Sequence, residues 1–199
     1  MCEKEMKRYR ALNALAEQGG LVIVGGSSDR EIPLCELKQA FALDSKLYNR
    51  SMTELSLKDA VKYYDTCIET LNPETVFLHI GESDLAFFVE DSAAFDQKYH
   101  ELIEHIRNRN KKCDIVIVSL KNPDEDAVIT EINKHLKYIS DSERCEYGDI
   151  TTKRVWNPKE TRDVVSFLYS TGFVRPFKNK RPLYDLVKIL FCFEPSYAV

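Results

Sequence analysis

Three short runs of apolar, largely β-branched residues constrain the fold of this chain more than any other feature. They span residues 21–24, 75–80 and 113–120. Each run is far too short to cross a membrane as a helix, since that requires about 20 apolar residues. Near-continuous apolar strands are typical of parallel sheets that are covered on both faces. We therefore predict that these runs form the centre of a buried parallel sheet.

Segments with helical periodicity separate the three runs, because their apolar residues recur three or four positions apart. The helices that this spacing predicts cover residues 6–15, 33–43, 57–71, 92–110, 124–140 and 182–193. Two shorter strands are expected at 46–52 and 145–150. Strands that alternate with helices predict a doubly wound, three-layer α/β/α fold with right-handed connections. We found no linker that suggests a second domain, so residues 1–199 are expected to form one domain.

The charge pattern argues against a nucleic-acid-binding protein. The formal net charge is −4, and the densest basic tract, residues 178–181, is short. Nucleic-acid-binding proteins usually carry a basic face. The first residues lack the apolar segment of a signal peptide, and no window is long and apolar enough for a membrane helix. We expect a cytoplasmic protein without a nucleic-acid or membrane partner.

The cysteines of the chain are widely dispersed along the sequence. There are six of them, and no two form a Cys-x-x-Cys pair. In a chain without a secretory signal, this pattern indicates reduced, mostly buried thiols rather than a disulfide framework or a zinc site. We saw no His-Glu-x-x-His motif or aspartate-rich loop either, so no metal and no cofactor is expected.

Small and polar residues follow three of the expected strands. The segments are Gly25-Gly26-Ser27-Ser28, Asn49-Arg50-Ser51 and Gly81-Glu82-Ser83-Asp84. In open α/β sheets, ligands bind beyond the carboxyl ends of the strands. In the first segment, the glycines allow a tight turn that leads to a serine hydroxyl and to backbone N–H groups suited to an oxyanion. An ordinary turn into a helix explains the same four residues.

Taken together, the segments LVIVGGSSD, LYNRSM and HIGESDL resemble the ordered sequence blocks of the SGNH, or GDSL-like, hydrolase family. The resemblance extends over about residues 21–172, and it implies a flavodoxin-like sheet of about five strands. It also implies that Ser27 is the nucleophile and that Ser51 supplies a backbone oxyanion donor. Gly81 and Asp84 match the third block, where Ser83 replaces the asparagine whose side chain is a further donor in the family.

The resemblance fails at the C-terminal block, which in the family is Asp-x-x-His with histidine as the general base. This chain has no Asp-x-x-His segment. The best alignment places Asp163 at the aspartate position and Ser166 where the histidine would stand. A serine hydroxyl without a base is a poor nucleophile at its free pKa. We therefore expect low activity if the chain is an enzyme, and we leave its enzyme status open.

For the other titratable residues, ordinary structural roles explain their positions in the sequence. His79 lies in an expected strand, and we predict a packed, hydrogen-bonded side chain rather than a base. Surface positions are expected for the histidines in the predicted helices, namely His100, His105 and His135. For the carboxylates near the strand ends we expect helix capping or solvation rather than catalysis; these are Asp29, Glu31, Glu54, Glu82 and Asp84.

Three functional hypotheses follow from these observations. The first is an ester or acyl hydrolase that acts on a small ester or an acylated carbohydrate. The second is a degenerate family member that binds a ligand or a protein without turnover. The third is a phosphate- or nucleotide-binding module that uses residues 25–27 at a helix start. The irregular stretch 151–182, which holds Asp163, is expected to be either a long loop that carries function or a flap over the sheet edge. The sequence leaves the oligomeric state open.

Overall fold

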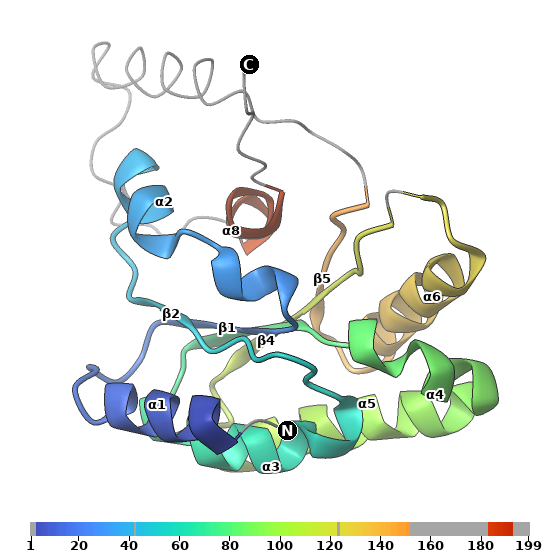
Figure 1. The fold of residues 1–199 in the computed structure, drawn as a ribbon, viewed down its shortest axis with the longest axis horizontal. Coiled ribbons are helices and arrows are strands. Elements are labelled where there is room, and N and C mark those ends of the chain that lie inside the picture. The colour runs from blue at the N-terminus through green and yellow to red at the C-terminus, as the bar shows by residue number, and fades with distance from the viewer. Residues whose placement is uncertain (1–2, 42, 123, 152–182, 193–199) are drawn as a thin grey trace.

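A five-stranded parallel sheet forms the centre of the protein (Figure 1). The computed structural model describes residues 3–41, 43–122, 124–151 and 183–192. The strands are β1 (Leu21–Gly25), β2 (Leu47–Asn49), β3 (Thr75–His79), β4 (Asp114–Val118) and β5 (Glu146–Gly148). Their order is β2-β1-β3-β4-β5, and every neighbouring pair is parallel. The predicted flavodoxin-like sheet is therefore confirmed.

Helices cover both faces of the sheet and complete the predicted three-layer α/β/α fold (Figure 1). One face is covered by α1 (Glu3–Asn13), α3 (Leu57–Cys67), α4 (Leu85–Glu90), α5 (Ser92–Arg109) and α6 (Ala127–Ser142). The other face is covered by α2 (Leu34–Ala40) and α8 (Leu183–Phe191). Short 3₁₀ turns are η1 (Ser28–Glu31), η2 (Glu69–Leu71) and η3 (Glu82–Asp84).

The two faces of the sheet explain why the central strands are apolar throughout. Successive side chains of a strand point to opposite faces. In β1, Val22 and Val24 pack in the larger core with α3, α5 and α6, whereas Leu21 and Ile23 pack in the smaller core with α2 and α8. All of β1 and β3 is buried. The pattern predicted from the three apolar runs is the consequence of this double covering.

Several element boundaries differ from the predicted ones. The predicted helix over 57–71 ends at Cys67 and is followed by η2, after which Asn72 adopts a left-handed conformation with φ 45°. The predicted helix over 33–43 is only the short α2, which ends at Ala40 with Phe41 as its C-cap; the 3₁₀ turn η1 precedes it. Helix α4 was not predicted at all. Asp163 and the rest of the stretch 152–182 lie outside the described residues.

The described cysteines include two thiols in the larger core. Cys67 and Cys113 are buried and form no disulfide bond. Burial raises the pKa of the Cys67 thiol to about 11 and that of Cys113 to about 12, because the thiolate is poorly solvated there. Both are therefore protonated and unreactive at neutral pH. Cys35 is exposed and departs from the predicted burial.

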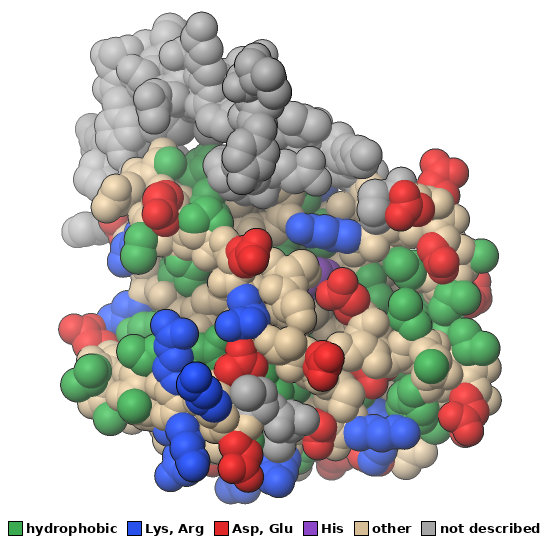
Figure 2. Space-filling view, viewed as in Figure 1, with side chains coloured by type: hydrophobic (Ala, Val, Ile, Leu, Met, Phe, Trp, Pro, Cys, Tyr) green, Lys and Arg blue, Asp and Glu red, His purple; other side chains and the backbone are tan. Residues whose placement is uncertain are grey.

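The described surface carries both signs of charge. In Figure 2, Lys and Arg side chains gather at the lower left, but Asp and Glu side chains lie among them. None of the described helices has the length and apolar character needed to cross a membrane. Within the same residues, no group of three or more potential ligand side chains is placed to hold a metal ion.

Asp84 connects η3 to the start of α3. Its two carboxyl oxygens accept from the Leu57 N–H at 3.2 and 3.0 Å. The side chain is buried, and desolvation raises the pKa of the Asp84 carboxyl group above its ordinary value. The prediction that Asp84 caps the helix that follows it is wrong, because its side chain makes no capping bond to α4 and instead accepts from the first N–H of α3.

We expect Asp84→Ala to lower the free energy of unfolding by about 1–3 kcal/mol, since it leaves the buried Leu57 N–H without an acceptor. Asp84→Asn keeps an acceptor and should lose less. Because the folded protein binds the Asp84 proton more tightly than the unfolded chain, stability should fall as pH rises from the ordinary pKa through the raised one. Urea unfolding against pH measures this slope, which should be smaller in Asp84→Asn; an equal slope in both proteins contradicts the assignment.

Gly148 in β5 allows α8 to approach the sheet closely. A Cβ atom built on Gly148 lies 2.8 and 2.9 Å from the two methyl carbons of Val187. Gly148→Ala should therefore destabilise the protein by about 1–3 kcal/mol through overpacking. Val187→Ala removes both methyl groups, so the double variant should be less destabilised than the sum of the single variants. A double-mutant cycle by urea unfolding measures this coupling, and strictly additive losses contradict the packing.

Candidate functional site

The three polar segments predicted from the sequence meet at the carboxyl edge of the sheet, around β1. The register pairs Gly25 of β1 with His79 of β3. On the other side, the Arg50 N–H donates to Ile23 O at 2.8 Å and the Met52 N–H to Gly25 O at 3.0 Å. The Ser51 segment therefore runs beside the Gly25 segment, and the Gly81 segment continues from the strand on its other side.

Ser27 lies directly after the two glycines, on the turn into η1. It is exposed, and its backbone is helical with φ −61° and ψ −42°. Its carbonyl oxygen accepts from the Arg30 N–H at 3.3 Å. A Cβ atom built on the buried Gly26 lies 3.0 Å from Glu82 Oε2, so the carboxylate of the third segment borders this turn. Ser27 is thus an exposed residue beside the loop that carries Glu82.

A buried acid–imidazole pair lies under the Ser27 turn. Asp29 Oδ2 lies 2.7 Å from His79 Nδ1 and accepts from the Gly26 N–H at 3.2 Å. Asp29 is 1% exposed and His79 is 3% exposed. His79 is therefore the packed, hydrogen-bonded histidine that we predicted. The prediction that Asp29 is solvated or caps a helix is wrong, because its carboxyl group faces inward to the imidazole.

Asn49 joins the second segment to the first. Its Nδ2 donates to Asp29 O at 2.6 Å, and its Oδ1 accepts from the Ser51 N–H at 2.9 Å. The backbone donor that the family resemblance assigns to Ser51 is therefore engaged by Asn49 in this structure. The Ser51 hydroxyl is buried and has no hydrogen-bond partner among the described residues. The sequence offered no sign of the Asn49 contacts, which depend on the folded turn.

Aromatic residues and Arg50 hold the second segment in place. The Arg50 guanidinium lies over the Tyr9 ring at 5.2 Å and the Tyr48 ring at 5.5 Å. Its Nε donates to Asn13 Oδ1 at 2.9 Å, which connects α1 to the sheet edge. The Tyr63 hydroxyl donates to the Arg50 carbonyl at 2.6 Å. These contacts fix the backbone that precedes Ser51.

The third segment turns sharply at Gly81, whose φ of 132° strongly favours glycine. A Cβ atom at this position would lie 3.5 Å from the Phe95 ring, so α5 packs against the turn. Glu82 and Ser83 are exposed at the edge, whereas Asp84 is buried and engaged by α3. The ligand-binding roles of Gly81, Ser83 and Asp84 stay predictions.

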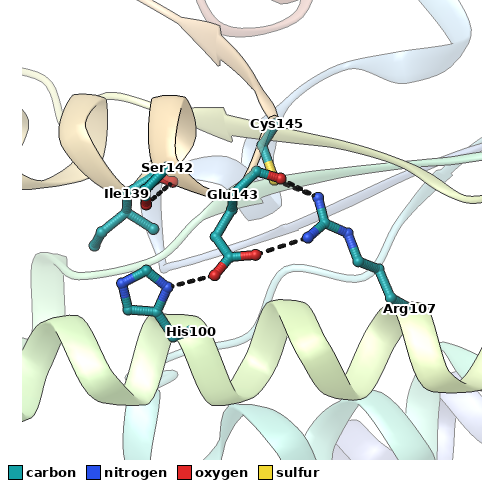
Figure 3. Close-up of polar contacts among 6 residues, drawn as sticks. All are labelled: His100, Arg107, Ile139, Ser142, Glu143 and Cys145. Carbon is teal, nitrogen blue, oxygen red and sulfur yellow. Dashed lines mark hydrogen bonds and ion pairs between the residues drawn. The ribbon is translucent and has the colours of Figure 1, made fainter.

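All four histidines of the chain lie in the described part, and each contacts a carboxylate. Figure 3 shows His100 and Arg107, both from α5, on either side of Glu143 at the end of α6. The three helix histidines were predicted at the surface, but they are partly buried and paired: His100 with Glu143, His105 with Asp65 and His135 with Asp96. None of the four is hydrogen-bonded to Ser27.

Asp163 and Ser166, the residues aligned with the missing C-terminal block, fall outside the described residues. The role of Asp163 therefore stays a prediction. Since every histidine of the chain lies elsewhere, the segment 152–182 contains no histidine.

Comparisons with known proteins give matches at the level of structure alone. No family model and no curated protein sequence matches the chain. A Streptococcus pneumonia protein, described as a platelet activating factor, is 16% identical with a TM-score of 0.63, covering 85% of this chain and 91% of that one. An acylhydrolase structure from Bacteroides fragilis is 15% identical with a TM-score of 0.60, covering 86% and 97%.

A GDSL-like lipase structure from Bacteroides thetaiotaomicron is 14% identical with a TM-score of 0.57, and the match covers 84% of this chain and 96% of that one. The matched structures include enzymes described as lipases, esterases and acylhydrolases. At such low identities, these structural matches establish similarity of fold alone, and the identities fit a divergent sequence. The chain has the SGNH/GDSL-like hydrolase fold.

Proposed function

We propose that this protein is an ester or acyl hydrolase with Ser27 as its nucleophile, acting on a small ester or an acylated carbohydrate. The observation that supports this most is the position of Ser27. Ser27 is exposed beyond the carboxyl end of β1, where the segments from β1, β2 and β3 meet. This is the position at which the fold places ligands.

The same edge offers donors for the oxyanion of the tetrahedral intermediate. The Ser27 N–H has no acceptor in the described part of the chain and is available to a substrate carbonyl. The exposed Ser83 hydroxyl is the second donor in this proposal. The Ser51 N–H contributes only if it leaves Asn49 Oδ1. Donors held in place before the reaction stabilise the developing negative charge.

The proposed reaction forms an acyl-enzyme at Ser27. The hydroxyl oxygen attacks the ester carbonyl carbon while its proton passes to a base, and the alcohol leaves with a proton. Water then attacks the acyl group and regenerates the hydroxyl. Because no histidine is hydrogen-bonded to Ser27, we assign the base to Glu82, whose carboxylate borders Gly26. This assignment replaces the solvated or capping role that the sequence predicted for Glu82. Carboxylates act as general bases in many enzymes.

A specific observation supports the degenerate alternative, in which the site binds a ligand without turnover. None of the four histidines is hydrogen-bonded to Ser27, so the imidazole base of the family is missing. The phosphate-binding alternative has less support, because Asp29 Oδ2 already accepts from the Gly26 N–H that a phosphate would need.

Ser27→Ala should abolish labelling by a fluorophosphonate probe and reduce p-nitrophenyl acetate hydrolysis to the buffer rate, since the nucleophile is gone. Ser28→Ala is the matched control, because Ser28 is the adjacent exposed serine, and it should be labelled like the wild type. Labelling that persists in Ser27→Ala removes Ser27 as the nucleophile. A wild-type protein that is neither labelled nor active supports the binding domain.

Glu82→Gln should lower kcat for p-nitrophenyl acetate by about 100-fold, the lower range for loss of a general base. Glu31→Gln removes another exposed carboxylate from the same rim and should leave kcat unchanged. Steady-state kinetics at neutral pH measure both variants. Equal kcat values for wild type and Glu82→Gln show that another group is the base.

A further inference from the structure

We infer that the buried Asp29–His79 pair is the positioning element of the site: it holds the Gly25–Gly26–Ser27 turn in the conformation that presents the Ser27 hydroxyl. The inference rests on the proposed function, since it concerns the same serine. It assigns a role to two side chains that the proposed reaction does not use. Neither is placed to contact the substrate, because both are buried beneath the turn.

The first support is that a single carboxyl oxygen joins the turn to β3. Asp29 Oδ2 accepts from the Gly26 N–H at 3.2 Å and lies 2.7 Å from His79 Nδ1. A Cβ atom at Gly25 would lie only 1.9 Å from this oxygen. The turn therefore wraps around the carboxyl group, and Gly25 is the residue that makes room for it.

The second support is that the same aspartate joins the second segment. The Asp29 carbonyl oxygen accepts from Asn49 Nδ2, and Asn49 Oδ1 accepts from the Ser51 N–H. One chain of hydrogen bonds thus runs from β3 through the Ser27 turn to the segment after β2. Losing its interior member changes the relative positions of the nucleophile and the oxyanion donors.

The third support is that His79 is itself fixed by packing. Its ring makes an edge contact with Phe191 of α8, at 5.4 Å between ring centroids. Its Nδ1 is bonded to Asp29, whereas its Nε2 is buried and has no hydrogen-bond partner among the described residues. The imidazole acts on the turn through Nδ1. A general-base role would require Nε2 to reach Ser27 instead.

Two amide substitutions separate these roles, because asparagine places its amide near the Nδ1 position and glutamine near the Nε2 position. His79→Asn keeps a group that bonds to Asp29, so its rate of fluorophosphonate labelling and its kcat should stay within a few-fold of wild type. His79→Gln loses the Asp29 contact, and labelling and kcat should fall by about 100-fold, the effect of a misplaced reacting group. KM should change little in either variant.

Amide hydrogen exchange of the peptide containing residues 25–29 provides a readout that does not depend on activity. It should be faster in His79→Gln and near wild type in His79→Asn. Asp29→Asn is the second variant, since its amide oxygen replaces Oδ2 as the acceptor for both groups. It should be folded, labelled within a few-fold of wild type and equally protected, which keeps the inference testable if His79→Gln does not fold.

Equal losses of labelling in His79→Asn and His79→Gln, with unchanged exchange, overturn the inference, because they indicate a role for the imidazole itself. Wild-type labelling rates in both variants also overturn it, as does a 100-fold loss in Asp29→Asn with unchanged exchange. If the wild type is not labelled at all, the proposed hydrolase function fails. The exchange comparison then decides the inference alone. Exchange that is faster in His79→Gln but not in His79→Asn supports it, and equal exchange in the two variants overturns it.

Discussion

The parallel pairing of β1 with a strand on each side determines where the candidate site residues of the described part of the chain lie. The chain leaves β1, returns as β2 on one side and then crosses to β3 on the other. The order of strands reverses at β1, and such a switch point separates the loops on the two sides and opens the sheet edge to ligands. The Ser27 segment leaves β1 at this point, and the Gly81 segment leaves β3 beside it.

The buried pair under the turn shows how the fold makes this edge rigid. Placing a carboxyl group inside a protein is unfavourable unless hydrogen bonds replace its water. Asp29 has the Gly26 N–H and the His79 ring for this purpose, and Asn49 connects its backbone to the next segment. An unpaired buried partner costs more than the net gain of the bond, so the contacts hold one another in place. The exposed serine therefore lies on a turn whose buried carboxyl group is hydrogen-bonded to the turn and to β3.

The sequence was sufficient to predict the sheet, because residues buried on both faces must be apolar in succession, as in β1 and β3. It was also sufficient to predict the three polar segments at one edge, since parallel strands share a direction. Helix α4 was missed because it has only six residues and too little periodicity to detect. Asp29 was misjudged because a carboxylate after a strand is normally solvated, and the partner that buries it lies 50 residues further along the chain. The hydrogen bonds of Asn49 were not predicted either, because they depend on a turn that forms only in the folded chain.

The distribution of histidines sets the chemical problem that a hydrolase of this kind must solve. Three histidines connect helices on the face opposite α2 and α8, and the fourth supports the Ser27 turn. None is hydrogen-bonded to Ser27, so the reaction that we propose relies on a weaker carboxylate base and on the accuracy with which the hydroxyl and the donors are held. Geometry contributes strongly to reactions of this kind, because small displacements of reacting groups cost large factors in rate. If Ser27 is the nucleophile, as we propose, a weak base makes the buried pair that positions it more important rather than less.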